Sequence, residues 1–260
     1  MNKIKTAFVF PGYGSQWKGM GAGLWEYDRF REAIRECGAQ FSMNPGVDWQ
    51  IEAEIRKPAA SSRLEETLVG YPCSLAIEIA LWELLKNWGV EPDGVIGHSG
   101  GETVAAYAAG ILNLRDTFKV IWNHWEEMKR SAGNVMMAHI GLPGEKVREI
   151  LQDEKLDRQV FISAQNSPSA TIVSGQRQAI EKLMEFLSGR KIFCRGLETL
   201  APFHSPLMEQ YRDTIYRRLE DVEPLKPSIP IYSSSKGGLS VETGGNPLYW
   251  TDHMIKPVNF

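Results

Sequence analysis

The sequence predicts an α/β protein in which a small second subdomain interrupts the main layers. Short apolar runs at residues 6–10 and 94–97 each end at a glycine-containing turn, as buried parallel strands often do. Segments with helical apolar spacing lie between and after these runs, which gives an α/β layer pattern. Between Ser131 and Glu198 the expected order changes to β-α-β-β-α-β, the ferredoxin-like arrangement.

The elements of the large part follow from local patterns. The run Thr6-Ala7-Phe8-Val9-Phe10 predicts a strand that feeds the glycine-rich loop Pro11-Gly12-Tyr13-Gly14-Ser15-Gln16. Apolar residues three and four apart predict a helix from Cys73 to Trp88, which Gly89 can end. The other helices expected here are residues 102–109, 116–130 and, after the insertion, 206–222.

The inserted part alternates strands with two helices. Its expected strands are residues 135–142, 160–165, 170–173 and 191–197, and its expected helices are residues 143–155 and 176–187. Pro143 suits the first turn of the first of these helices. We therefore assign residues 132–198 to a ferredoxin-like small subdomain, and residues 1–131 and 199–260 to the large subdomain.

Composition narrows the function classes. The 260 residues are 43% hydrophobic and 23% charged, as in ordinary globular proteins, and a net charge of −3 indicates neither nucleic acid nor an anionic membrane as a partner. Cys37, Cys73 and Cys194 form no C-x-x-C pair and suit small buried residues in a reducing compartment. The five histidines show no metal-ligand spacing, so no metal is expected. We find no signal peptide and expect no membrane-spanning stretch, which indicates a cytoplasmic protein.

The most informative residue is Ser99, within Gly97-His98-Ser99-Gly100-Gly101. This G-x-S-x-G segment follows an expected strand and precedes an expected helix, which is the setting of a nucleophile elbow. A serine on such a turn is exposed and can attack a carbonyl carbon. The backbone N–H of Gly100, at the start of the helix, could stabilise the resulting oxyanion.

A serine nucleophile needs a base, and His204 is the best placed candidate. It lies in Ala201-Pro202-Phe203-His204-Ser205-Pro206, a loop that precedes a helix. His139 alternates with apolar residues, so it suits a packed strand residue. His253 has little sequence context.

Four motifs occur in order along the chain and carry a family resemblance. They are Pro11-Gly12-Tyr13-Gly14-Ser15-Gln16, Gly97-His98-Ser99-Gly100-Gly101-Glu102, Asn166-Ser167-Pro168 to Val173-Ser174-Gly175, and Pro202-Phe203-His204-Ser205. Together they resemble the acyltransferase domains of polyketide and fatty acid synthases, including malonyl-CoA:acyl carrier protein transacylases. The resemblance covers essentially the whole chain and implies an α/β-hydrolase-like large subdomain with a central parallel sheet and a ferredoxin-like small subdomain.

The resemblance also implies roles for individual residues. Ser99 would accept the acyl group from coenzyme A, or from a carrier-protein thioester, as an ester. His204 would be the general base and acid, oriented by backbone carbonyls rather than by an aspartate. The backbone N–H groups of Tyr13 and Gly100 would form the oxyanion hole.

Five further side chains are expected to bind the substrate: His98, His124, Phe203, Gln16 and Asn166. No bound cofactor is implied, because the acyl thioester itself is the substrate. The phosphopantetheine thiol of an acyl carrier protein would then receive the acyl group.

The sequence departs from the family pattern at three positions. Tyr13 stands where the loop usually has Gln, and Tyr71 stands where Gln usually precedes Pro72. In malonyl-type members an arginine lies four residues before a Met, Leu or Gln and binds the substrate carboxylate with two hydrogen bonds. Met128 sets the register here, and the matching residue is His124, which cannot form that clamp.

Phe203 indicates a different substrate class from His124. In the family, Phe before the histidine accompanies an unbranched malonyl-like group, whereas Ser accompanies methylmalonyl. A malonyl unit with a small polar substituent would satisfy both Phe203 and His124, and an acyl group without a carboxylate would satisfy His124 alone.

Two other functions stay open at this stage. A carrier-protein thioesterase or general esterase would share the fold and the Ser–His pair, and a docking domain would not need either residue.

The segment 249–260 resembles a point at which family members continue for several dozen residues. We therefore expect a large subdomain that is incomplete at its C-terminus, whether the chain is freestanding or part of a longer synthase with neighbouring domains.

Overall fold

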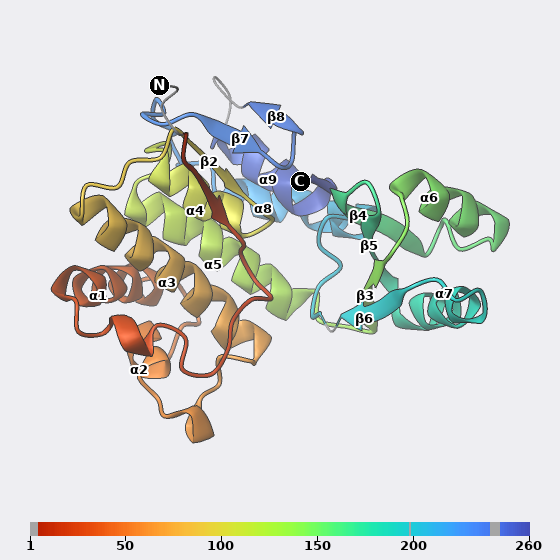
Figure 1. Cartoon of the computed structure of the whole chain (residues 1–260), viewed down its shortest axis with the longest axis horizontal. Helices are drawn as coiled ribbons and strands as arrows, with labels where there is room; N and C mark the ends of the chain where they lie inside the picture. Colours follow the sequence, from red (N-terminus) through yellow and green to blue (C-terminus); the bar gives the residue numbers. More distant parts are fainter. Residues whose placement is uncertain (1–4, 198, 240–244) are drawn as a thin grey trace. The chain divides into compact units, whose positions relative to one another are not determined.

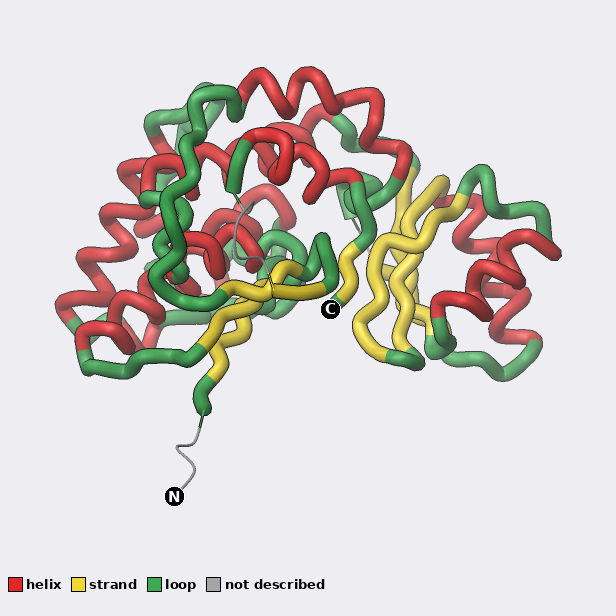
Figure 2. The backbone as a smooth tube through the Cα atoms, turned by 90° about the horizontal axis from the view of Figure 1, so that it is seen from above, coloured by secondary structure: helices red, strands yellow, loops and turns green. Residues whose placement is uncertain are grey.

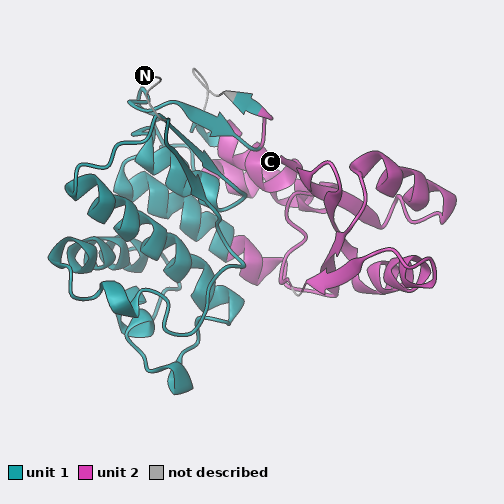
Figure 3. Ribbon diagram, viewed as in Figure 1, with its two compact units in different colours: residues 1–125, 219–234, 238–247 teal, residues 126–218, 235–237, 248–260 magenta. Residues whose placement is uncertain are grey.

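A sheet with three parallel strands organises the part of the chain that carries Ser99 (Figure 1). The computed structural model describes residues 5–197, 199–239 and 245–260. These fall into two units, the first of which comprises residues 1–125, 219–234 and 238–247 (Figure 3). Its sheet has the order β1-β2-β7-β8, where β8 alone is antiparallel to its neighbour. The strands are β1 (Ala7–Phe10), β2 (Gly94–Gly97), β7 (Ile231–Ser233) and β8 (Gly238–Leu239).

Helices pack around this sheet and against one another. The long helix α3 packs against α1, α2 and α4, and α4 packs against β1 and β2 (Figure 1). The helices are α1 (Asp28–Ser42), α2 (Ile51–Ile55), α3 (Thr67–Asn87), α4 (Gly101–Ala108) and α5 (Leu114–Arg130), with short 3₁₀ turns η1 (Ala22–Leu24) and η2 (Ala59–Ser61). Helix α5 begins in the first unit and ends in the second.

Helix α3 begins six residues before the predicted Cys73, and it contains Pro72. Proline lacks the N–H that would bond to the carbonyl four residues earlier, which belongs to Leu68. The indole N–H of Trp125 donates to that Leu68 carbonyl at 2.7 Å. A side chain from α5 therefore replaces the missing helix bond, which allows the helix to continue through Pro72.

The expectation that no stretch could span a membrane was wrong by length and composition. Among the described residues, helix α3 is long and apolar enough to cross a membrane: it has 21 residues, and its most apolar 18-residue window has a mean hydropathy of 1.5. However, 78% of its most apolar window is buried inside the structure. That burial is typical of a core helix, which is apolar on all sides because other elements surround it.

The second unit comprises residues 126–218, 235–237 and 248–260. It contains the β-α-β-β-α-β order expected for residues 132–198, of which residue 198 lies outside the described residues. The elements are β3 (Val135–Ile140), α6 (Gly144–Asp153), β4 (Val160–Ser167), β5 (Ala170–Gln176), α7 (Arg177–Gly189) and β6 (Cys194–Leu197). The two compact units divide the chain at other residues than 132 and 198. The subdomain boundaries at 132 and 198 stay a prediction.

The strands of the second unit form an antiparallel sheet with one added edge strand. Their order is β6-β3-β5-β4-β9, and β9 (Val258–Asn259) pairs in parallel with β4. Helices α6 and α7 lie on one face of this sheet (Figure 2), and their apolar residues share a buried core with β3, β4 and β5. The ferredoxin-like arrangement is therefore confirmed, as is the α/β fold class with its central parallel sheet.

Two smaller sequence expectations were only partly right. The helix expected over residues 206–222 is a 3₁₀ segment, η3 (Pro206–Tyr211), followed by α8 (Arg212–Arg218). Helix α9 (Pro247–Ile255) was not predicted. Cys37 and Cys73 are buried, as expected, and burial raises the pKa of both thiols, whereas Cys194 is only half-buried.

Candidate active site

Ser99 lies on a tight turn between β2 and α4. Its φ angle is +50°, a left-handed conformation that is uncommon for a residue with a side chain. The backbone N–H of Glu102 bonds to the Ser99 carbonyl at 2.8 Å, so the helix begins immediately after the serine. This strand, strained serine and helix are the geometry that the G-x-S-x-G motif predicts.

Glycine is required on both sides of Ser99 because backbone atoms pass close by. A Cβ atom on Gly97 would lie 2.2 Å from the backbone nitrogen of Glu102. A Cβ atom on Gly101 would lie 2.1 Å from the carbonyl oxygen of Phe10. Both distances are far below a van der Waals contact, so the elbow can form only with these glycines.

The loop after β1 packs directly on this elbow. Gly12 has a φ angle of +72°, and a Cβ atom there would lie 2.6 Å from the nitrogen of Gly101. Tyr13, the next residue, donates its phenol O–H to Thr67 Oγ1 at 3.0 Å. The structure therefore brings together the two segments that carry the expected oxyanion donors, Tyr13 and Gly100.

Gln16 and His98 flank these segments. The Gln16 side-chain oxygen accepts a hydrogen bond from the backbone N–H of Gly14 at 2.8 Å, so it closes the glycine-rich loop upon itself. His98 is half-buried between Gly97 and Ser99, and its backbone N–H bonds to the Phe10 carbonyl at 2.9 Å. Their expected roles in substrate binding remain predictions.

Two of the departures from the family pattern are in direct contact. Tyr71 Oη lies 2.7 Å from His124 Nδ1, and both side chains are buried. Burial also raises the pKa of the Tyr71 phenol, which keeps its proton. A Cβ atom on Gly100 would lie 2.8 Å from the Tyr71 ring, so this pair lies beside the residue that follows Ser99.

His204 lies in the second unit, in a left-handed conformation with a φ angle of +59°. Its side chain is 6% exposed, and its Nδ1 atom lies 3.1 Å from the carbonyl oxygen of Lys256. A carbonyl can only accept, so Nδ1 must carry the proton in this contact and the lone pair is on Nε2. A backbone carbonyl thus orients the imidazole with Nε2 as the basic atom.

The other two histidines in the second unit differ in their surroundings. His139 is half-buried in β3 and contacts the Phe193 ring, with centroids 5.3 Å apart, as a packed strand residue would. His253 is 1% exposed, and its ring lies 5.6 Å from that of His204. The contact between His253 and His204 could not be predicted from the sequence, because His253 lies on α9, which was not predicted.

The remaining predicted residues also belong to the second unit. The carbonyl of Phe203 accepts a hydrogen bond from Ser174 Oγ at 3.5 Å. Asn166 lies near the end of β4, where the pairing with β5 is irregular. The structure therefore describes two groups of predicted residues: Ser99 with Tyr13, Gly100, Gln16, His98 and His124 in the first unit, and His204 with Phe203 and Asn166 in the second.

Comparisons with known proteins identify the family. The family model for the acyl transferase domain matches residues 7–260. The chain is 32% identical to the polyketide synthase GfsE of Streptomyces halstedii over 98% of its length, and 34% identical to the erythronolide synthase EryA3 of Saccharopolyspora erythraea. It spans only 7% and 8% of those two proteins. The chain belongs to the acyl transferase domain family.

Solved structures agree with this assignment. A loading acyltransferase from the avermectin modular polyketide synthase is 32% identical, with a TM-score of 0.89 over 97% of this chain and 80% of that one. FabD from Acinetobacter baumannii is 26% identical, with a TM-score of 0.86 over 98% and 81% of the two chains. The likeness to acyltransferases of polyketide and fatty acid synthesis is therefore confirmed in both sequence and structure.

The packing of the elbow predicts the effect of adding one methyl group. Gly101→Ala should destabilise the protein by about 3 kcal/mol or more, since the new Cβ must displace the Phe10 backbone. Chemical denaturation would measure this loss. Gly23→Ala is the matched control, because no atom lies within 4 Å of its Cβ position, and it should change stability by less than about 0.5 kcal/mol. Equal stabilities of the two variants would contradict the close packing described here.

Proposed function

We propose that this domain transfers an acyl group from a thioester, through an ester on Ser99, to the phosphopantetheine thiol of an acyl carrier protein. The observation that carries the proposal is the left-handed Ser99 between β2 and α4, held by glycines that leave no room for side chains. This geometry exposes the hydroxyl and places the N-terminus of α4 beside it. Membership of the acyl transferase family supports the same chemistry.

In the proposed first step, His204 Nε2 takes the proton of Ser99 Oγ while the oxygen attacks the thioester carbon. The backbone N–H groups of Tyr13 and Gly100 stabilise the tetrahedral oxyanion. The C–S bond then breaks, and the departing thiolate receives the proton from His204. This step requires the two units to bring His204 and Ser99 together.

In the second step, the same groups act in reverse. His204 removes the proton of the phosphopantetheine thiol, and the sulfur attacks the ester carbon on Ser99. The Ser99–acyl bond breaks and the serine oxygen regains its proton. The acyl ester is therefore a true intermediate, and the two thiol compounds use the site in turn.

The buried Tyr71–His124 contact favours one substrate class over another. An imidazole lacks the two parallel N–H donors of a guanidinium, and the Nδ1 atom of His124 already contacts the Tyr71 phenol. His124 therefore cannot hold a carboxylate through the paired bonds that an arginine supplies. This favours an acyl group without a free carboxylate over the substituted malonyl unit, and the likeness to a loading acyltransferase is in keeping with that choice.

The remaining partners follow from the same proposal. The relatives are long synthases of which this chain spans a small part, so neighbouring synthase domains are proposed partners along with the carrier protein. No bound cofactor is required, because the donor thioester supplies the acyl group and the carrier protein supplies the thiol that accepts it. We also propose a cytoplasmic location, where such thioesters would be met.

Intact-mass spectrometry against a panel of acyl thioesters tests the proposed reaction. The protein should gain the mass of one acyl group, and a carrier protein with its phosphopantetheine thiol should remove it. Rapid loss of the adduct to water without a carrier protein would indicate the alternative, an acyl thioesterase. Failure to form any adduct would contradict both enzymes and favour a docking domain.

Substitution of the two predicted catalytic residues should separate their roles. Ser99→Ala should abolish the adduct, because it removes the hydroxyl that the proposal makes the acyl acceptor. His204→Ala should slow adduct formation by roughly 10²–10⁴-fold, the usual contribution of a general base. The rate of mass gain measures both. An unchanged rate in His204→Ala would remove this histidine from the mechanism.

Changes at the buried tyrosine–histidine pair should alter substrate choice. His124→Arg combined with Tyr71→Gln replaces both members of the pair. The change removes the phenol that contacts residue 124 and supplies a guanidinium that can bind a carboxylate. Acylation by malonyl-CoA should rise at least about tenfold relative to acylation by acetyl-CoA or propionyl-CoA. Competition between paired thioesters, read by mass, gives this ratio. The same ratio in the original and the altered protein would show that the pair does not set specificity.

A further inference from the structure

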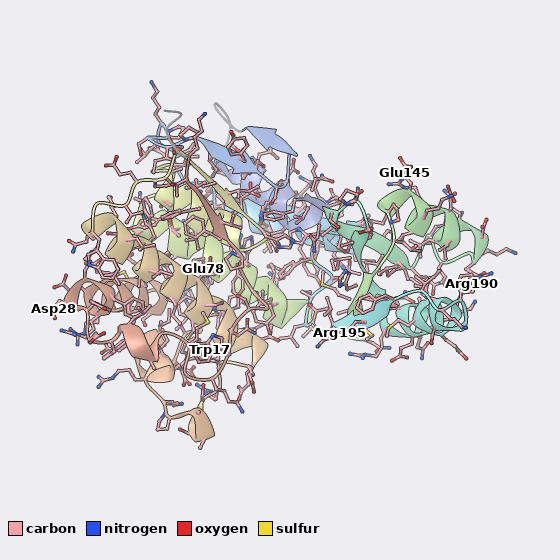
Figure 4. The ribbon with its side chains drawn as sticks, viewed as in Figure 1. Trp17, Asp28, Glu78, Glu145, Arg190 and Arg195 are labelled. Atoms are coloured by element: carbon pink, nitrogen blue, oxygen red, sulfur yellow. The ribbon has the colours of Figure 1, made fainter. Side chains whose placement is uncertain are left out.

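Glu78 is a half-buried residue whose carboxyl group lies against the loop that carries Tyr13. It lies on α3, and its Oε1 atom accepts a hydrogen bond from the backbone N–H of Gly12 at 3.1 Å (labelled in Figure 4). Its Oε2 atom is also buried and has no hydrogen-bond partner among the residues the structure describes. No ion pair to Glu78 is present within the same described part of the chain. A carboxyl group in this setting requires an explanation, because burying an unpaired charge is costly.

Among the described residues, no ion pair joins Glu78 to the elements packed against α3. The ionisable side chains of these elements have other partners: Arg29 of α1 bonds to Glu83 and Glu36, Glu54 of α2 bonds to Lys57 and Arg63, Glu102 of α4 bonds to Ser234, Tyr107 of α4 bonds to Glu83, and His124 of α5 contacts Tyr71. Tyr71, on α3 itself, keeps its proton. Burial accordingly raises the pKa of Glu78 to about 8, so the group is mostly neutral at pH 7.

The contact acts on the backbone next to the expected oxyanion donor. Gly12 immediately precedes Tyr13, and it is held between the elbow at Gly101 on one side and the Glu78 carboxyl on the other. The Tyr13 phenol is fixed separately by Thr67. The bond from the Gly12 N–H anchors the Pro11–Gly12 peptide, and the close packing on Gly101 limits where Gly12 can lie. The next peptide, which carries the N–H of Tyr13, extends from this anchored residue.

We propose that Glu78 is a positioning residue for the oxyanion hole: its carboxyl group anchors Gly12, from which the Tyr13 peptide extends, without placing a negative charge beside the developing oxyanion. The inference rests on the proposed function, since it concerns the same reaction. A neutral acceptor suits this place because a carboxylate there would repel the oxyanion that the loop must stabilise. Glu78 contacts the loop through the Gly12 N–H, so its proposed effect on the reaction acts through Gly12.

The test uses a probe that does not depend on the natural acyl group. An alkyl fluorophosphonate reacts with an activated serine: the serine oxygen bonds to phosphorus and fluoride departs. The rate of Ser99 labelling is followed by intact mass for the original protein, Glu78→Gln and Glu78→Met. Glu78→Gln keeps an oxygen for the Gly12 N–H but cannot ionise, whereas Glu78→Met removes the acceptor with little change in size.

At pH 7 the Gln variant should label at nearly the original rate, and the Met variant should be slower by about tenfold to hundredfold. That loss is smaller than the roughly 10²–10³-fold cost of removing an oxyanion donor altogether, because the Tyr13 N–H is displaced rather than lost. Labelling of the Met variant at the original rate would overturn the proposal. Circular dichroism confirms that each variant is folded.

The pH dependence distinguishes positioning from a purely structural role. As the pH rises from 7 to 9 the Glu78 carboxyl ionises, so labelling of the original protein should fall while that of Glu78→Gln should not. A carboxyl group whose pKa is raised on folding makes the folded state bind more protons than the unfolded one between pH 4.5 and 8. Stability should therefore fall as the pH rises through that window, and Glu78→Gln should abolish this part of the fall.

The outcomes separate this inference from the proposed function. If the original protein fails to label with any fluorophosphonate, Ser99 is not an activated nucleophile and the proposed function fails, while the melting temperatures still report on Glu78. If the original protein labels and both its labelling and its melting temperature follow the same pH profile as in Glu78→Gln, the inference about Glu78 is wrong and the proposed function is unaffected.

Discussion

The structure depends on one close backbone contact, in which the glycine-rich loop after β1 rests on the turn at Ser99. Gly12 and Gly101 approach so closely that neither tolerates a Cβ atom, and Phe10 and Gly97 take part in the same packing. This contact joins the ends of two neighbouring parallel strands, β1 and β2. It therefore ties the geometry of the serine to that of the loop that would supply an oxyanion donor. Because backbone atoms make the contact, the requirement appears in the sequence as glycines, with few constraints on the side chains around them.

Two titratable side chains of α3, Tyr71 and Glu78, lie beside this contact. Helix α3 runs beneath it as a buried core helix and contributes Tyr71 and Glu78, both of whose protons are retained because burial disfavours the charged forms. Neutral hydrogen-bonding groups in such a setting hold the loop without opposing the negative charge of a tetrahedral intermediate. At position 124 a histidine stands in place of a guanidinium, and this is the basis of the proposed preference for an acyl group without a carboxylate.

Much of this could be predicted from the sequence, because the elbow is local. The run of apolar residues before Gly97 and the glycines around Ser99 are enough to indicate the strand, the turn and the helix that the structure contains. The β-α-β-β-α-β order of the second unit was also predictable, since each of its elements has its own local pattern. What could not be predicted depends on distant residues. The start of α3 requires the Trp125 indole to replace a bond lost at Pro72, and the role of Glu78 requires knowing that the Gly12 N–H lies above it. The neighbourhood of His204 and His253 similarly depends on α9, which has no distinctive pattern of its own.

The decisive measurement is a crystal structure of the domain after reaction with an acyl thioester that it accepts. We predict electron density for an ester on Ser99 Oγ, with its carbonyl oxygen within hydrogen-bond distance of the backbone N–H groups of Tyr13 and Gly100, and with His204 Nε2 beside the ester oxygen. An acyl group attached to another residue, or an ester carbonyl that points away from both N–H groups, would contradict the central claim.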